Sequence, residues 1–184
     1  MEDAGYAVSM DFKQVGDLVY IVGTTQNELG GSEYFRSRGF IGNSVPKVNP
    51  RLAKELMDKL SAATEKGLVR ACHDCSDGGI DVAIAEMAFA GGLGTSINLE
   101  SIPLGEPIDR DDFILFSESN SRFLVEVAPE NQNEFEKIMA GVSLAHIGQV
   151  TDGEVLEIYG VAGRKVVAVS LGELKEAWQK PIRW

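Results

Sequence analysis

The stretch LVRACHDCSDGGIDVAIAEMAFAGG (residues 68–92) carries the strongest structural signals in this 184-residue sequence. Its first five residues predict a short strand that delivers His73 and Asp74 to its C-terminal end. After a polar turn, residues 79–90 form a segment that is apolar on nearly all sides, which is typical of a buried helix. Two glycines then stop the helix. The stretch therefore predicts a strand, a polar turn and a buried helix.

Strands and helices are mixed along the rest of the chain. Apolar runs predict strands at residues 18–23, 95–100, 144–150, 154–159 and 164–169, and a further strand with Phe123, Val125 and Val127 on one side. Helices are predicted from Ser32, from Asn49-Pro50 to Gly67, over residues 130–140, and from a capping box of Ser170 and Glu173. Their expected inward side chains are Leu52, Leu56, Leu60, Ala63, Phe135, Ile138, Met139, Leu174 and Trp178. Because strict βαβ alternation is absent, we predict an α+β fold with a mixed, mainly antiparallel sheet and packed helices.

The composition is that of an ordinary globular domain, with 44% hydrophobic and 24% charged residues. The formal net charge of −11 disfavours nucleic acid as a partner, so an anionic ligand would need local donors or a metal ion. No apolar run approaches the roughly 20 residues that cross a bilayer, and we expect no membrane association. The acidic first residues lack the form of a signal peptide, and only two cysteines are present, which favours a cytoplasmic protein with reduced thiols.

Cys72 and Cys75 form a Cys-x-x-Cys pair, a pattern found in redox-active dithiols and in zinc sites. A position just before a helix lowers a thiol pKa, but acidic neighbours, which are present here, raise it. A structural zinc ion needs four ligands, and only His73 and the distant His146 could join the pair. We interpret the two cysteines as buried or half-buried small hydrophobic residues. His146 is interpreted as an ordinary strand histidine.

The same turn reads H-D-x-S-D-G-G at the predicted strand-to-helix junction. Gly78 and Gly79 would let backbone N–H groups approach a phosphate, and the helix that they open adds positive potential. Asp74 offers the kind of oxygen ligand that Mg²⁺ takes together with substrate phosphates, and Ser76 can hydrogen-bond a phosphate or a metal-bound water. Alternatively, Ser76 or the second Asp only caps the helix while the glycines make the turn. The local pattern leaves both interpretations open.

Three motifs together resemble one family. They are ELGGSEYFR (28–36), HDCSDGGIDVAIAEMAFAGG (73–92) and FSESNSRFLVEV (116–127), and they occur in the order seen in phosphoribosylformylglycinamidine synthase. The resemblance runs from about Val8 to Trp178. This synthase resembles two tandem units of the aminoimidazole ribonucleotide synthetase type, each an ATP-binding domain followed by an α+β C-terminal domain. By this resemblance residues 15–184 are the C-terminal domain of the second unit, and residues 1–14 are a lead-in from a missing upstream ATP-binding domain.

The resemblance implies an ATP-dependent ligase of purine biosynthesis. In the whole enzyme, ATP activates the amide oxygen of formylglycinamide ribonucleotide as an iminophosphate, and ammonia from glutamine displaces phosphate to give the amidine and ADP. The implied partners are the remaining synthase domains, a glutaminase subunit and a small bridging subunit, which form an amidotransferase complex. Without the ATP-binding domain, the isolated chain is expected to be inactive.

For the second unit, the resemblance implies an auxiliary site for ATP or ADP. Asp74 would be a Mg²⁺ ligand, Ser76 a nucleotide contact, and Gly78 and Gly79 the residues that shape the phosphate-facing turn. No residue of this chain is expected to be catalytic. At the position of Cys75 the family is variable, which agrees with an incidental cysteine.

A second turn is implied to be near a substrate. Ser117, Glu118 and Ser119 correspond to a turn that touches the ribonucleotide substrate in the first unit, so they are substrate-turn candidates here. Asn120 stands where glutamine is usual, and its shorter side chain weakens a carried-over contact.

Several alternatives stay open from the sequence. The chain could be a non-catalytic nucleotide-binding or assembly domain, or another ATP-dependent enzyme of the superfamily, although those relatives carry different residues at these motifs. Glu33 and Tyr34 could line the same cleft or pack against the missing half, and Glu86 could face a buried partner or the domain boundary. A domain apart from its neighbours should expose an apolar patch, which we expect at Leu18–Val22 or at the GGSEY loop.

Overall fold

One sheet organises the chain in the computed structural model, which describes residues 3–182. The predicted lead-in (residues 1–14) and domain (residues 15–184) include residues 1–2 and 183–184, which lie outside the described part. The strand order is β2-β4-β1-β5-β3-β6-β7. Neighbouring strands are antiparallel except β3 and β6, which are parallel. The strands are β1 (Leu18–Val22), β2 (Val69–Asp74), β3 (Gly94–Asn98), β4 (Phe123–Val127), β5 (Leu144–Thr151), β6 (Val155–Tyr159) and β7 (Lys165–Ser170).

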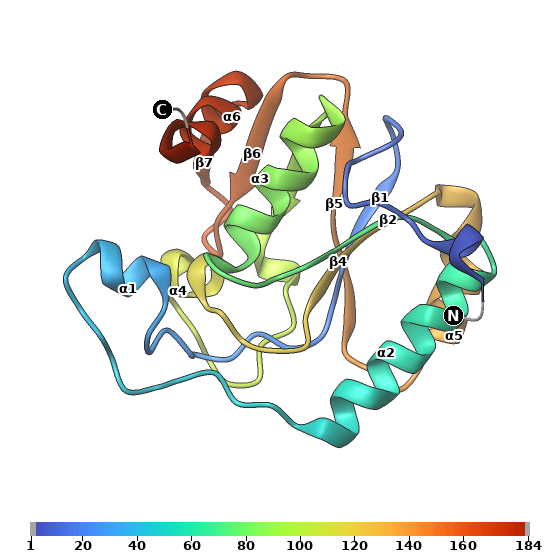
Figure 1. Cartoon of the computed structure of the whole chain (residues 1–184), viewed down its shortest axis with the longest axis horizontal. Coiled ribbons are helices and arrows are strands. Elements are labelled where there is room, and N and C mark those ends of the chain that lie inside the picture. The colour runs from blue at the N-terminus through green and yellow to red at the C-terminus, as the bar shows by residue number, and fades with distance from the viewer. Residues whose placement is uncertain (1–2, 183–184) are drawn as a thin grey trace.

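Helices cover both faces of this sheet (Figure 1). They are α1 (Glu33–Ser37), α2 (Pro50–Glu65), α3 (Gly79–Gly91), α4 (Asp111–Phe116), α5 (Gln132–Ile138) and α6 (Leu171–Gln179), with 3-10 helices at Ala4–Tyr6, Leu99–Ser101, Pro129–Asn131 and Lys180–Ile182. The helices α3, α4 and α6 pack on one hydrophobic cluster, and α2 and α5 pack on the other. The predicted mixed, mainly antiparallel α+β fold is confirmed.

The interior strand β1 is buried on both faces. Val19 and Ile21 belong to the cluster under α3, while Tyr20 and Val22 belong to the cluster under α2. This division follows from the alternation of side chains along a strand. The expectation of an exposed patch at Leu18–Val22 is therefore wrong, because β1 pairs with β4 on one side and β5 on the other.

Exposed apolar side chains gather instead in the segment between α1 and the first turn of α2. They are Phe40, Ile41, Val45, Val48 and Leu52. This segment directly follows the GGSEY loop and runs along one rim of the molecule (Figure 1).

Helix boundaries follow the capping signals. Asn49 caps α2 by accepting the Leu52 N–H at 3.3 Å, and the capping box of Ser170 and Glu173 opens α6. Of the expected inward side chains of α2, Leu56, Leu60 and Ala63 are buried. The expectation for Leu52 is wrong, because this side chain is 58% exposed and borders a cavity at the end of the sheet.

The expected inward positions of the remaining helices are confirmed except for Trp178. Phe135 and Met139 are fully buried, and Ile138 and Leu174 are partly buried against the two clusters. Trp178 is half-exposed, with its ring centroid 5.7 Å from that of Phe89.

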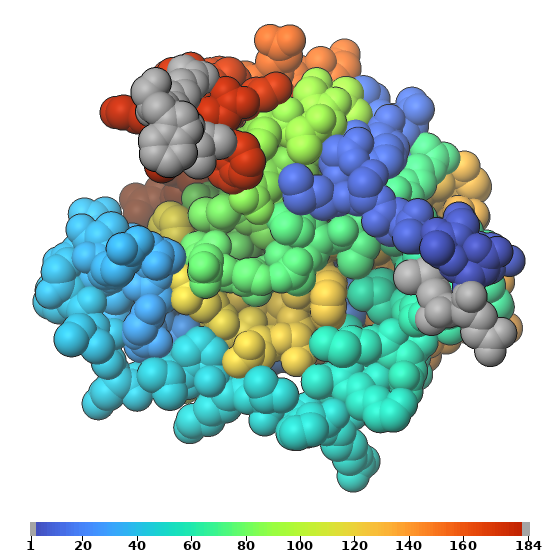
Figure 2. Space-filling view, in the orientation of Figure 1, coloured from blue at the N-terminus to red at the C-terminus, as the bar shows by residue number. Residues whose placement is uncertain are grey.

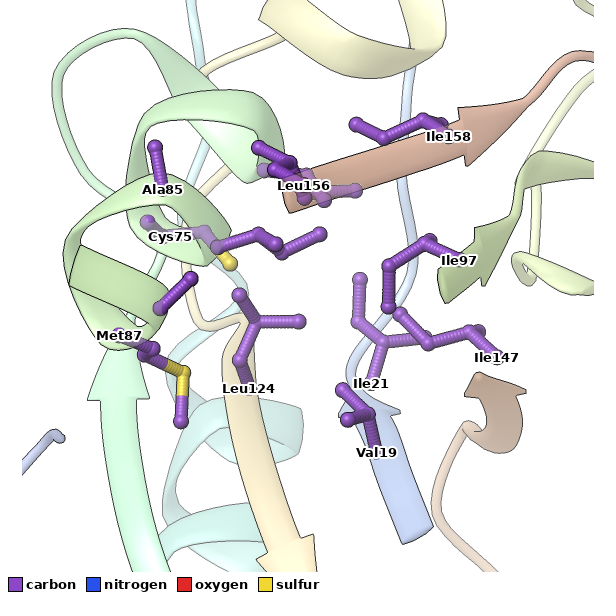
Figure 3. Close-up of a cluster of buried hydrophobic side chains, with 14 of the residues drawn as sticks. Val19, Ile21, Cys75, Ala85, Met87, Ile97, Leu124, Ile147, Leu156 and Ile158 are labelled. Carbon is purple, nitrogen blue, oxygen red and sulfur yellow. The ribbon is translucent and has the colours of Figure 1, made fainter. Parts of the chain in front are cut away.

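The two cysteines lie in the hydrophobic clusters. Cys75 is 6% exposed, and its sulfur points among Met87, Leu124 and their neighbours (Figure 3). Cys72 packs against the opposite cluster. Burial raises the pKa of Cys75 to about 11 and that of Cys72 to about 12, which outweighs any effect of the following helix. Their interpretation as small hydrophobic residues is confirmed. His146 lies in β5, with Nε2 2.8 Å from the Gly148 carbonyl oxygen, as expected of a strand histidine.

The segment before β1 packs onto the sheet. The Cys72 N–H donates to the Ser9 carbonyl at 3.2 Å, and the buried Phe12 donates its N–H to Met87 of α3. The first of these contacts lies on the outer edge of β2, and the second joins the segment to α3. Whether residues 1–14 lead in from another domain stays a prediction.

A buried acidic pair fastens this segment. Glu126, in the middle of β4, is fully buried and accepts the backbone N–H groups of Lys13 and Gln14 at 2.9–3.0 Å. Asp17 is also buried, 3.1 Å from the Arg70 guanidinium. Burial raises the pKa of both carboxyls, that of Glu126 to about 7, because charge is disfavoured away from water and the two groups are neighbours.

Among the described residues, no helix combines the length and the apolar character needed to cross a membrane.

Candidate functional site

Three connecting segments meet at one end of the sheet. Because β4 is antiparallel to β1 and β2, and β5 is antiparallel to β1, the C-terminal ends of β1 and β2 lie beside the N-terminal ends of β4 and β5. The loop after β1, the turn before α3 and the turn before β4 all begin or end there. Figure 2 shows residues 117–122 (yellow) between the 73–80 segment (green) and the 42–57 segment (cyan). Side chains on such connecting segments, held by a rigid sheet, commonly form binding sites.

Glu118 joins the three motifs that the sequence analysis singled out. Its Oε1 accepts the Gly78 N–H at 2.9 Å and the Glu33 N–H at 2.9 Å. One carboxylate of the SES turn thus holds the start of α3, in the SDGG motif, and the start of α1, in the GGSEY motif. The motifs are far apart in the sequence and come together at this oxygen atom.

Ser117 and Ser119 point into the protein. Both side chains are buried, and their hydroxyl oxygens are 3.0 Å apart. The Ser117 hydroxyl donates to the Gln26 carbonyl at 2.7 Å, and Ser119 Oγ accepts the Gln26 N–H at 3.0 Å. The two serines therefore fix the loop after β1, and Glu118 is the member of the turn that borders the open hollow described below.

Arg122 holds together the turn before β4 and the loop after β1, and the sequence analysis did not identify it. Its side chain is 1% exposed, with Nε 2.9 Å from the Ser119 carbonyl oxygen and Nη1 2.9 Å from Thr25 Oγ1, and Nη2 donates to the Ser117 carbonyl. Burial lowers the pKa of this guanidinium. Its one sequence signal is a charged residue directly before an apolar strand. The buried guanidinium donates charge-assisted hydrogen bonds to two carbonyl oxygens of the turn and holds its shape.

The turn before β4 is also locked by its backbone. Ser121 has a left-handed φ of 60°, which is uncommon for a residue with a side chain. A Cβ at Gly23 would come within 2.4 Å of the Ser121 carbonyl oxygen, so the end of β1 approaches this turn as only glycine allows.

Asp74 and Ser76 lie together at the end of β2. The Asp74 side chain is 59% exposed; its Oδ2 accepts the Ser76 hydroxyl, and its Oδ1 is 3.6 Å from His73 Nδ1. The strand is longer than predicted and includes both His73 and Asp74. The predicted metal ligand and the predicted nucleotide contact are therefore adjacent and open to solvent.

The two glycines have paired N–H groups and close neighbours. The Gly78 N–H donates to Glu118, and the Gly79 N–H donates to the Ser76 carbonyl at 3.0 Å. Both residues have positive φ, and a Cβ at Gly79 would lie 2.4 Å from the Ser117 carbonyl oxygen. Packing thus requires glycine at 79, and a phosphate on the Gly78 N–H would have to replace the Glu118 carboxylate.

Two neighbouring hollows border the SES turn. The larger, of about 580 Å³, is lined by Asp74, Ser76, Asp77, Glu118 and Arg122, among others. The smaller, of about 190 Å³, lies on the other side of Asn120 and Ser121, which line both. Its walls combine polar groups such as Gln26 and Glu28 with apolar side chains of α2.

Glu33 and Tyr34 have structural contacts. The Glu33 side chain pairs with Arg36, and the Tyr34 ring stacks on Phe116 with centroids 4.6 Å apart. The Tyr34 hydroxyl donates to Asp112 at 2.7 Å.

A metal ion at this end would need ligands from outside the protein. Within residues 3–182, no group of three or more His, Cys, Asp or Glu side chains is arranged to hold a metal. The exposed oxygen pair of Asp74, beside the Ser76 hydroxyl, fits Mg²⁺ that arrives with nucleotide phosphates, since this ion takes one or two carboxylates and keeps phosphate and water ligands.

Residues 14–161 match the family model described as AIR synthase related protein, C-terminal domain. Over 182 residues the chain is 35% identical to phosphoribosylformylglycinamidine synthase subunit PurL of Alkaliphilus metalliredigens, covering 97% of this chain and 24% of that protein. The chain thus spans about a quarter of the length of this curated relative.

Solved structures of PurL from Thermotoga maritima have the same fold over 93% of this chain. The complex with FGAR has a TM-score of 0.80 at 24% identity and is matched over 30% of its chain. The complex with ADP has 0.77 at 23% over 27%, and PurLQS has 0.79 at 24% over 28%. At these identities the likeness supports the fold alone.

Proposed function

This chain belongs to the AIR synthase related family, whose C-terminal domain it matches, and on that premise we propose that it is the C-terminal domain of the second unit of a phosphoribosylformylglycinamidine synthase. The whole enzyme would convert formylglycinamide ribonucleotide, ammonia from glutamine and ATP to the amidine, ADP and phosphate. The 35% identity to a PurL subunit extends over nearly the whole chain, and this supports the synthase against other members of the superfamily.

The observation that carries the proposal is the meeting of three motifs at Glu118. GGSEY, SDGG and SES belong to three different connecting segments, and one carboxylate oxygen joins them. A helix cap alone would need one acceptor at Gly78 and no link to α1. The arrangement instead makes a polar corner that faces a hollow of about 580 Å³, large enough for part of a nucleotide.

We infer that the corner is an auxiliary site for ADP or ATP with Mg²⁺. Asp74 would hold the cation, and Ser76 would donate to a phosphate oxygen or accept from a metal-bound water. The Gly78 N–H would bind a phosphate oxygen once Glu118 moves aside, at the N-terminus of the 13-residue helix α3. Bound Mg²⁺ would neutralise phosphate charge. Ser117 and Ser119 would act by holding the loop that carries Gln26, with Glu118 as the substrate-turn residue that faces the hollow.

The proposed partners are the other synthase domains, a glutaminase subunit and a small bridging subunit. The name of the PurLQS structure supports an assembly of this kind for a relative. A cytoplasmic location is part of the proposal, and the two free cysteines favour it. Residues 1–184 alone should form no amidine, because the family model that they match describes a C-terminal domain. Amidine production by these residues alone would overturn this point.

The test is the thermal midpoint of the chain with and without Mg-ADP. A ligand that binds only the folded state at a hundredfold excess over its Kd stabilises it by about 2.7 kcal/mol, which raises the midpoint of a domain of this size by roughly 5–10 °C. Asp74→Asn should abolish the magnesium-dependent part of the rise. Asp77→Asn, at the rim of the same hollow, is the matched control and should keep it. A midpoint that ADP leaves unchanged in the wild type contradicts the proposed site.

A further inference from the structure

Glu86 connects the C-terminal helix to the strand that carries Asp74. It lies on α3, whose other side chains are mostly apolar. From the sequence, it could face either a buried partner or the domain boundary. Its Oε2 is 2.7 Å from His73 Nε2, and its Oε1 accepts the Trp178 Nε1–H at 2.9 Å. Each carboxylate oxygen thus has its own partner, one on β2 and one on α6.

His73 carries this connection to the corner. Its side chain is 18% exposed and lies between two carboxylates, with Nε2 on Glu86 and Nδ1 3.6 Å from Asp74 Oδ1. Because the hydrogen bond to Glu86 fixes the plane of the ring, it also fixes the nitrogen that faces Asp74. The other Asp74 oxygen accepts the Ser76 hydroxyl. One Asp74 oxygen is therefore held by a hydrogen bond from Ser76, and the other faces, at 3.6 Å, a His73 ring whose orientation is set by Glu86.

We propose that Glu86 is a positioning residue for the nucleotide corner. Through His73 it orients the Asp74 carboxylate, and through Trp178 it couples this orientation to the packing of α6 on the domain. The inference rests on the proposed function, since Asp74 matters only if a Mg²⁺–nucleotide complex binds there. Partners that orient a metal ligand commonly change metal affinity by 10- to 100-fold when they are removed. By thermodynamic reciprocity, the ligand must also strengthen the docking of α6.

The experiment compares Mg-ADP affinity, measured by calorimetry, in Glu86→Leu, Glu86→Gln and Trp178→Phe. Loss of the carboxylate in Glu86→Leu should weaken the affinity about tenfold. Glu86→Gln keeps an acceptor oxygen for the Trp178 N–H but places an NH₂ donor at His73 Nε2, so it should recover part of the affinity. Trp178→Phe removes the N–H donor but keeps a ring beside Phe89, and should weaken the affinity about fivefold, even if Glu86→Leu fails to fold.

A matched control separates positioning from simple stability. Glu173 closes the capping box of α6 and does not contact Glu86, so Glu173→Ala should lower the thermal midpoint and leave the Kd for Mg-ADP unchanged. A second readout is the emission of Trp178 in a Trp184→Phe background, where it is the remaining tryptophan; Mg-ADP should change this emission, and Asp74→Asn should abolish the change.

The outcomes are distinguishable. Wild-type binding with an unchanged Kd in Glu86→Gln, Glu86→Leu and Trp178→Phe overturns the positioning role and leaves the proposed function intact. If Glu173→Ala weakens binding as much as Trp178→Phe does, the link through Glu86 is also overturned, because general loosening of α6 would then explain both. No binding of Mg-ADP by the wild type overturns the proposed function and this inference together.

Discussion

Folding stability should fall as the pH rises through the range in which the Asp17–Glu126 pair loses its proton. The pKa of Glu126 is raised to about 7 in the folded state, against an ordinary value of 4.5. The folded protein therefore keeps a proton that the unfolded chain has released above pH 4.5. The stabilisation is complete below pH 4.5 and is lost progressively up to about pH 7. The loss is about 3 kcal/mol, at about 1.4 kcal/mol for each pH unit of the difference.

The surroundings of Glu126 explain why its pKa is raised. Glu126 is fully buried in β4 and accepts three N–H···O contacts from Lys13 and Gln14, which oppose the shift but do not cancel the loss of water. Asp17 shifts in the same direction, so the two carboxyls titrate as a pair. Arg70 is the cation beside this pair, and it divides its guanidinium between Asp17 and the exposed Glu130.

Urea unfolding from pH 5 to pH 8 tests this reasoning. Glu126→Gln keeps an acceptor oxygen for the segment before β1 and cannot ionise. Relative to the wild type, it should gain about 2–3 kcal/mol of stability between pH 5 and pH 8, slightly less than the full loss, because part of the wild-type stabilisation is already lost at pH 5. Glu130→Gln, which alters the exposed partner of Arg70, is the control and should show little such gain. A difference between Glu126→Gln and the wild type that does not change with pH would refute the account of the pair.

Three further predictions concern the corner and the cysteines. Gly79→Ala should destabilise the fold by about 2–4 kcal/mol, because a Cβ there meets the Ser117 carbonyl oxygen at 2.4 Å. Gly67 has a similar positive φ but open space around it, so the control Gly67→Ala should cost about 1 kcal/mol. Equal urea midpoints for the two variants would contradict this. Glu118→Ala should tighten magnesium-free ADP binding several-fold, because the carboxylate no longer competes for the Gly78 N–H, and calorimetry that finds weaker binding would contradict the competition. Both thiols should react slowly with a disulfide reagent at pH 8 in the native protein and rapidly in urea, because burial raises their pKa values to about 11 and 12. Fast reaction of either thiol in the native protein would contradict this protection by burial.

Local signals predicted much of the fold. The Asn49 cap and the Ser170–Glu173 capping box mark where α2 and α6 begin, because these contacts join residues three positions apart. The apolar character of α3 correctly indicated burial. The position of β1 between two strands of the sheet was missed, since it depends on pairing with strands more than a hundred residues away.

The candidate site was predictable in its parts but not in its connections. The motifs indicated Asp74, Ser76 and the glycine turn, and the structure brings these residues to one hollow. The double role of Glu118 and the buried Arg122 depend on long-range contacts that no local pattern encodes. The same holds for Glu86, which meets partners from two elements that are distant in sequence.

The most direct test of the central claim is an amide-resolved NMR titration of the whole chain with Mg-ADP. We expect the largest shifts at the N–H groups of Gly78 and Glu33, because both donate to the Glu118 carboxylate that a phosphate must displace. Shifts should also reach Asp74 and Ser76. Saturating Mg-ADP that leaves the Gly78 and Glu33 resonances unmoved would contradict a nucleotide site at this corner.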